Sequence, residues 1–127
     1  MSKSVLVVDD ETNIVLSLEF LMKQAGHEVR IATDGEEALR LVEEKIPDLI
    51  LLDLMIPKRD GYDVCQTIRA NPEMDQVKIV MLTARGLEVE REKGLSLGAN
   101  AYVTKPFSTQ GLTELVNSLL GESGGNG

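Results

Sequence analysis

Residues 49–53 read Leu-Ile-Leu-Leu-Asp, an apolar run that ends abruptly in a carboxylate. Two similar runs occur elsewhere in the chain, Val5-Leu6-Val7-Val8 before Asp9-Asp10 and Ile79-Val80-Met81-Leu82 before Thr83. A strand that is covered on both faces has this uninterrupted apolar pattern, which is typical of a parallel sheet with helices on each side. The three runs therefore predict the central strands of an α/β fold.

Two further segments, Val29-Arg30-Ile31 and Tyr102-Val103-Thr104, alternate in polarity and suit the edges of the same sheet. Apolar residues at helical spacing follow each of the five strands, near residues 14–25, 38–42, 64–68, 87–97 and 112–120. This alternation predicts a doubly wound, five-stranded parallel sheet with right-handed crossovers. With the alternating strands at the edges, the simplest strand order is 2-1-3-4-5, and a ligand crevice opens at the carboxyl ends of strands one and three.

The chain has 127 residues, of which 21 are acidic and 13 are basic, and its net charge of −8 argues against direct binding to nucleic acid or anionic lipid. The single cysteine, Cys65, excludes an intrachain disulfide. No apolar run approaches the ~20 residues that cross a membrane, and the N-terminus lacks a signal-peptide pattern. We therefore expect a cytoplasmic protein, with one domain over residues 1–120 and a flexible, Gly-rich tail over 121–127.

Polar residues stand at or just after the end of four predicted strands: Asp9 and Asp10, Asp53, Thr83, and Lys105. Because parallel strands place their carboxyl ends at one rim, we expect these side chains to converge. Three crowded carboxylates repel one another unless a cation lies between them, and Mg²⁺ prefers such oxygen ligands. Asp53 can then act as a nucleophile toward a phosphoryl group, with Lys105 neutralising its charge and the Thr83 hydroxyl donating to it.

Several of these residues also have ordinary structural interpretations when taken singly. Asp9 or Asp53 could cap a helix, Lys105 could be a solvated charge, and Tyr102 could be a simple edge-strand aromatic. The charges near residues 88–93 are, by default, a solvated helix face. His27 is expected on the surface, and Gly61 is expected to need a positive φ in the turn after Pro57.

Four segments, which include the predicted strand ends, together resemble the receiver domains of two-component response regulators of the chemotaxis-regulator type. They are Val7-Val8-Asp9-Asp10, Leu51-Leu52-Asp53-Leu54-Met55, Leu82-Thr83-Ala84 and Tyr102-Val103-Thr104-Lys105-Pro106-Phe107. The motifs follow the family's order and spacing over about residues 4–120. The resemblance implies a flavodoxin-like three-layer sandwich, and the family's sheet has the strand order given above.

The resemblance also implies the function. Asp53 would accept a phosphoryl group from the phosphohistidine of a sensor histidine kinase or phosphotransfer protein, and Lys105 would bind that group. Mg²⁺ would be held by Asp9, Asp10, Asp53 and the Met55 backbone carbonyl. The Lys105–Pro106 bond would be cis. Thr83 and Tyr102 would form a switch pair that alters the surface of the fourth helix, fifth strand and fifth helix, to control a downstream effector or a phosphorylation-dependent homodimer.

Such a chain would not be an enzyme, since it would catalyse only its own phosphorylation and slow dephosphorylation. The main alternative is a Mg²⁺-dependent phosphatase acting through an aspartyl-phosphate, but Met55 stands where that chemistry often places a second acid. A flavin or nucleotide carrier is a further alternative, but this chain has no Gly-rich phosphate-binding loop after strand one. A docking module that takes no phosphate is another alternative, but it would not need the complete set of Asp9, Asp10, Asp53, Thr83 and Lys105. We further expect Met55 and Arg85 to influence the lifetime of the acyl phosphate.

Overall fold

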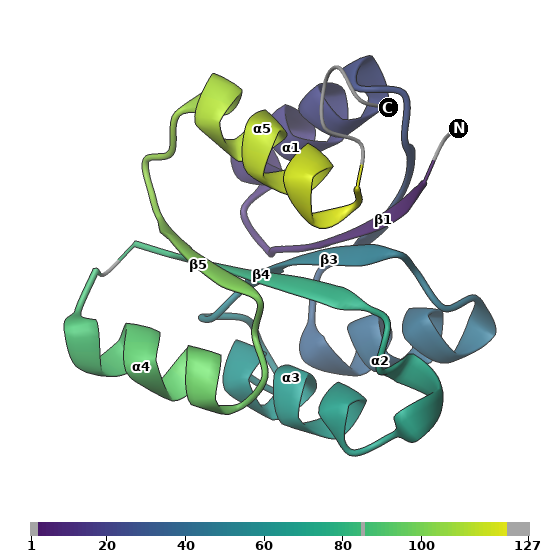
Figure 1. The fold of residues 1–127 in the computed structure, drawn as a ribbon, viewed down its shortest axis with the longest axis vertical. Coiled ribbons are helices and arrows are strands. Elements are labelled where there is room, and N and C mark those ends of the chain that lie inside the picture. The colour runs from purple at the N-terminus through teal and green to yellow at the C-terminus, as the bar shows by residue number, and fades with distance from the viewer. Residues whose placement is uncertain (1–2, 85, 122–127) are drawn as a thin grey trace.

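The computed structural model describes residues 3–84 and 86–121, in which strands and helices alternate along the chain (Figure 1). The strands are β1 (Ser4–Val8), β2 (Glu28–Ala32), β3 (Leu49–Asp53), β4 (Lys78–Thr83) and β5 (Ala101–Thr104). The helices are α1 (Thr12–Gln24), α2 (Gly35–Glu44), α3 (Gly61–Arg69), the 3₁₀ turn η1 (Pro72–Met74), α4 (Glu88–Ser96) and α5 (Thr109–Leu119). Arg85 and residues 122–127 of the predicted tail lie outside the described residues.

All five strands form one parallel sheet in the order β2-β1-β3-β4-β5, as predicted. The register brings the carboxyl ends of neighbouring strands level with one another. Val8 of β1 pairs with Leu52 of β3, and Asp53 pairs with Leu82 of β4. The polar residues at and just after these positions therefore share one edge of the sheet.

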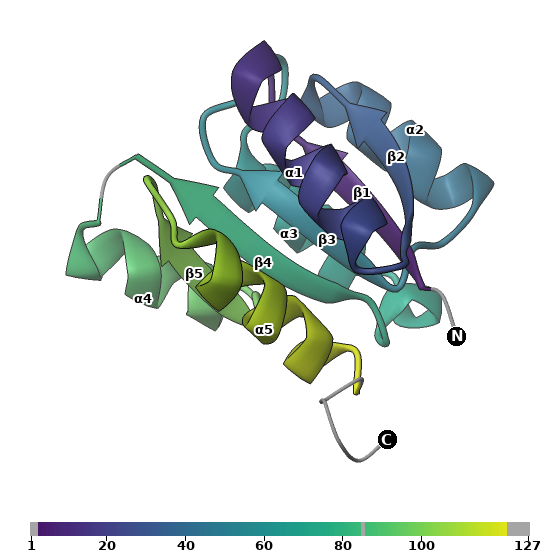
Figure 2. The same cartoon turned by 90° about the horizontal axis from the view of Figure 1, so that it is seen from above.

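Helices cover both faces of the sheet, with α1 and α5 on one face and α2, α3 and α4 on the other (Figures 1 and 2). Alternate side chains of each central strand enter different cores. Leu49 and Leu51 of β3 pack with α1 and α5, whereas Ile50 and Leu52 pack with the opposite helices. All five residues of β3 are buried, which explains why this strand has an uninterrupted apolar sequence.

Three of the helices begin with a side-chain cap at the edge that carries the site. Asp34 accepts a hydrogen bond from the Glu37 amide, Asp60 from the Asp63 amide, and Ser108 from the Gly111 amide. These residues satisfy amides that the first helical turn leaves without partners. Among the described residues, no helix combines the length and the apolar composition that crossing a bilayer requires.

Two expectations from the sequence are wrong. His27 is buried, and its Nε2 lies 3.2 Å from Oδ1 of Asn117 on α5, so it links two elements rather than facing solvent. Gly61 does not have a positive φ; the residue in this loop that does is Lys58, at 71°. A Cβ atom on Gly61 would lie 2.8 Å from the Asp53 carbonyl oxygen, so a close approach of two backbone segments, rather than a turn conformation, requires this glycine.

Candidate functional site

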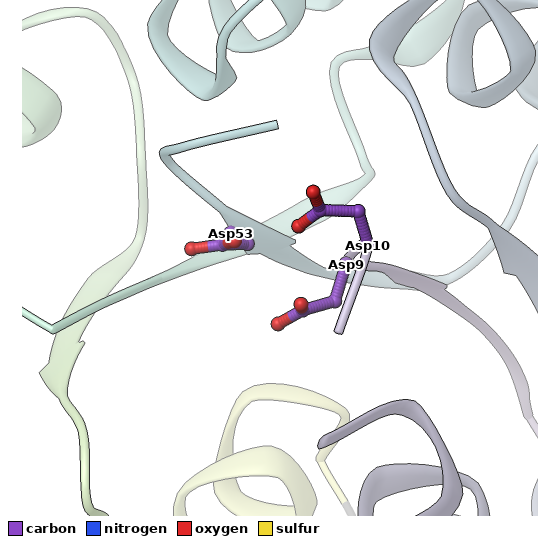
Figure 3. A group of neighbouring side chains, drawn as sticks. All are labelled: Asp9, Asp10 and Asp53. Carbon is purple, nitrogen blue, oxygen red and sulfur yellow. The ribbon is translucent and has the colours of Figure 1, made fainter. Parts of the chain in front are cut away.

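Three carboxylates from two adjacent strands converge at the carboxyl edge of the sheet. Asp9 and Asp10 directly follow β1, Asp53 ends β3, and one oxygen from each lies within 4.8 Å of the others (Figure 3). Asp9 and Asp53 are buried, whereas Asp10 is exposed and forms the open side of the group. The predicted convergence of the three carboxylates is therefore confirmed, and its cause is the level register of β1 and β3.

The ammonium group of Lys105 lies among these acids. Its Nζ donates to Asp9 Oδ2 at 2.9 Å and lies 3.5 Å from Asp53 Oδ1 and 3.4 Å from Glu11 Oε1. The Lys105–Pro106 bond is cis, as the resemblance implied, and the Lys105 amide donates to the Thr83 carbonyl at 2.6 Å. The lysine side chain is only 10% exposed, so its charge is directed inward and is not solvated.

The site has more negative than positive charge, and the pKa values of its groups reflect this. Burial and the neighbouring charge of Asp9 raise the pKa of Asp53, although Lys105 and a hydrogen bond from the Met55 amide act in the opposite direction. Burial lowers the pKa of Lys105, but the hydrogen bond to Asp9 and the charges of Asp53 and Asp9 outweigh it and raise the value. One lysine thus offsets part of the acidic charge, and the donor set suits a hard, oxygen-binding dication.

Thr83, at the end of β4, is in direct contact with Tyr102 of β5, the strand at the border of the sheet. Thr83 is buried, and a side-chain hydrogen bond links its hydroxyl to that of Tyr102. The Tyr102 hydroxyl also donates to Glu90 Oε1 at 3.3 Å, and Tyr62 of α3 donates to the Glu90 carbonyl at 3.1 Å. Tyr102 is therefore half-buried beneath α4, and its hydroxyl is hydrogen-bonded to both Thr83 and Glu90.

Two residues at or near the site were not identified from the sequence. Glu11 pairs with Lys105, and its position immediately after Asp9-Asp10 is the one signal that could have suggested this. Glu90 was assigned to a solvated helix face, yet it meets both tyrosine hydroxyls. Met55 follows Asp53 by two residues and is 66% exposed, and Arg85 is not among the described residues.

Comparisons with known proteins agree with this arrangement. A family model of the response regulator receiver domain matches residues 5–117. A response regulator from Chloroflexus aurantiacus is 37% identical, with a TM-score of 0.91 over 95% of this chain and 99% of its own. The receiver domain of the sensor histidine kinase PA1611 from Pseudomonas aeruginosa, solved with a magnesium ion in its active-site cleft, is 32% identical, with a TM-score of 0.87 and the same coverages.

A third structure, the BeF3-activated receiver domain of DrrB, is 30% identical, with a TM-score of 0.86 over 95% of this chain and 99% of that one. The matched residues include all of the sheet except Ser4, together with the acidic cluster, Thr83 and Lys105. The family match thus covers most of the chain and the complete site. The chain belongs to the family of response regulator receiver domains.

Proposed function

We propose that this receiver domain accepts a phosphoryl group on Asp53 from the phosphohistidine of a sensor histidine kinase or a phosphotransfer protein, in a reaction that depends on Mg²⁺. The observation that carries the proposal is the convergence of Asp9, Asp10 and Asp53 around the inward-facing ammonium of Lys105. A magnesium ion in the cleft of the Pseudomonas relative and BeF3 activation of the DrrB domain support it.

Asp53 is the nucleophile in this proposal. One of its carboxylate oxygens forms a bond to phosphorus while the bond from phosphorus to the histidine nitrogen breaks, and that nitrogen keeps the electron pair. The carboxylate must be ionised to attack. Burial raises the pKa of Asp53 and opposes ionisation, whereas Lys105 and the Met55 amide favour it. Lys105 also neutralises charge on the transferred group, and phosphoryl transfer requires mainly such positioning and neutralisation.

Asp9, Asp10, Asp53 and the Met55 backbone carbonyl are the proposed ligands of the metal. The three carboxylate oxygens fit a small dication because they are close together and carry more charge than Lys105 offsets. When bound, Mg²⁺ would supply positive charge next to the transferred oxygens. The exposed Asp10 leaves this side of the cluster accessible to a donor from outside.

Thr83 and Tyr102 are the proposed switch pair. When the Thr83 hydroxyl turns to donate to the new phosphoryl group, its hydrogen bond to Tyr102 is lost, and Tyr102 then takes a new position under α4. The surface formed by α4, β5 and α5 changes as a result. We propose that this surface controls a downstream effector domain or protein, and that phosphorylation promotes homodimer formation through it.

The receiver domain is a signalling module rather than an enzyme with a separate substrate. We propose that it comprises residues 1–120, because α5 ends at Leu119, and that it acts in the cytoplasm, where ATP-dependent kinases form the phosphohistidine donor. Met55 and Arg85 follow Asp53 and Thr83 by two residues, and we propose that they influence the lifetime of the acyl phosphate. Unchanged dephosphorylation rates after substitution at both positions would contradict this role.

Incubation with acetyl phosphate tests the central proposal. Intact mass spectrometry should find one added phosphoryl group when Mg²⁺ is present and none when it is chelated. Asp53→Asn should abolish the addition, and Asp75→Asn, which alters an exposed acid on a different loop, should leave it unchanged. Labelling of Asp53→Asn to the wild-type level would rule out Asp53 as the acceptor.

A further inference from the structure

The first residue of α2, Gly35, lies very close to the loop between β3 and α3. A Cβ atom on Gly35 would overlap the carbonyl oxygen of Arg59 and would lie 2.7 Å from its Cβ. Both contacts are far closer than van der Waals contact, and the nearer of the two atoms belongs to the backbone. Gly35 has no positive φ, so conformational freedom does not explain the glycine. The position requires a residue without a side chain because the β3–α3 loop occupies that space.

Other contacts hold the same two segments together. The Gly35 amide donates to the Pro57 carbonyl at 3.1 Å, and the Lys58 ammonium lies 3.7 Å from Asp34. The Arg59 side chain is in turn held on α3, where it donates to Asp63 at 2.9 Å. These contacts restrict any displacement of the loop that a side chain at position 35 would require.

The loop that Gly35 contacts connects β3, the strand that ends in Asp53, to α3. Its inner end is Asp53 and Leu54, and the Gly61 amide donates back to the Leu54 carbonyl at 3.0 Å. The amide of Met55 in the same loop donates to the Asp53 carboxylate. A displacement of the loop at Arg59 would thus be transmitted over a few residues to the backbone that orients Asp53.

We propose that Gly35 is a positioning residue for the phosphorylation site, because its missing side chain lets the start of α2 lie against Pro57 and Arg59 and so support the β3–α3 loop, whose Met55 amide orients Asp53. This inference rests on the proposed function, since it assigns a support to the same metal and phosphoryl site. Groups that orient metal ligands from outside typically alter metal affinity or activity by about 10–100-fold when they are changed.

The test compares Gly35→Ala with Gly111→Ala by isothermal titration with Mg²⁺ and by the rate of labelling from acetyl phosphate. Gly111 is the matched control, because its added Cβ would meet only the side chain of Ser108, at 3.3 Å. We expect Gly35→Ala to raise the Kd for Mg²⁺ by about tenfold, and Gly111→Ala to leave it unchanged. A Kd for Gly35→Ala within about threefold of wild type would overturn the inference.

A purely structural role would lower the free energy of unfolding without changing Mg²⁺ affinity in the folded fraction, so urea denaturation of both variants accompanies the titration. If Gly35→Ala does not fold, hydrogen exchange of the wild-type protein tests the inference instead. Coupling is reciprocal, so saturation with Mg²⁺ should slow exchange of the Gly35 amide, and an unchanged rate would overturn the inference. Failure of the wild type to bind Mg²⁺ would instead contradict the proposed function itself.

Discussion

Replacing Lys105 with methionine isolates the charge balance of the site, because methionine keeps an unbranched side chain and removes the ammonium. In the metal-free protein this substitution leaves the buried Asp9 and Asp53 without their nearby cation. We expect three linked results: a less stable metal-free protein, a tighter Mg²⁺ site and slower phosphorylation. Once Mg²⁺ is added, the loss of the ammonium still lowers the free energy of unfolding, whereas the tighter binding of the metal raises it.

The magnitude follows from the distances. At an effective dielectric constant of ~20, charges 2.9 Å apart interact by roughly 6 kcal/mol and charges 3.5 Å apart by roughly 5 kcal/mol. Dehydration of the buried groups offsets much of this, and removing one partner of a buried pair usually costs about 3–5 kcal/mol. Asp53 can take up a proton because its pKa is already raised, so we expect a loss of about 3 kcal/mol, near the lower limit.

Urea denaturation at pH 7, with and without Mg²⁺, measures the effect. The free energy of unfolding should be lower by about 3 kcal/mol in the absence of metal, and a parallel thermal melt should show a melting temperature lower by about 10 °C. The loss should shrink as the pH falls, because protonation of Asp53 relieves the uncompensated charge. Mg²⁺ should bind the variant more tightly, by about tenfold, since it no longer competes with an ammonium.

Lys23→Met is the matched control. Lys23 pairs with Glu19 on the surface of α1, with its side chain 59% exposed, and should contribute less than about 1 kcal/mol. Equal stability of Lys105→Met and wild type at pH 7 without metal would refute the reasoning, because the lysine would then not be balancing the buried acids.

Three further substitutions have defined outcomes. Asp53→Asn should raise the free energy of unfolding of the metal-free protein at pH 7, because burial and the charge of Asp9 raise the pKa of this carboxyl. The gain should vanish as the pH falls to 3.8, the ordinary pKa of an aspartate side chain. Urea titrations that find no gain at pH 7 would contradict this prediction. Gly61→Ala should cost about 1–3 kcal/mol in the same assay, since its Cβ would strike the Asp53 carbonyl, and a neutral effect would argue against the close approach. Asp34→Ala should cost about 1 kcal/mol by removing the cap of α2, whereas Asp34→Asn, which keeps an acceptor, should cost little; equal losses in thermal melts would count against a capping role.

The strand order and the convergence of the site residues could be predicted from the sequence because both depend on local patterns. Each central strand has an apolar run of four residues, and a polar residue at or just beyond the end of each run meets the others at one edge. Parallel pairing turns residues that are far apart in sequence into neighbours. No detail of side-chain packing is needed for that conclusion.

Features that depend on contacts between distant segments could not be predicted. His27 stands between Gly26 and Glu28, a local sequence typical of an exposed turn, and its partner Asn117 is 90 residues away. Gly35 and Gly61 are required by backbone that approaches from the β3–α3 loop. Among the charged residues at the start of α4, only the positions of two tyrosines distinguish Glu90 from its neighbours.

The central place of β3 determines which parts of the molecule can respond to a modification of Asp53. The strand is bonded to a neighbour on each side, so its end is a fixed point. By contrast, β5 has four residues and is paired on one side only within the sheet. A modification of Asp53 would therefore meet less resistance on the side of β5 than within β3 itself, and the proposed switch pair, Thr83 and Tyr102, lies on that side.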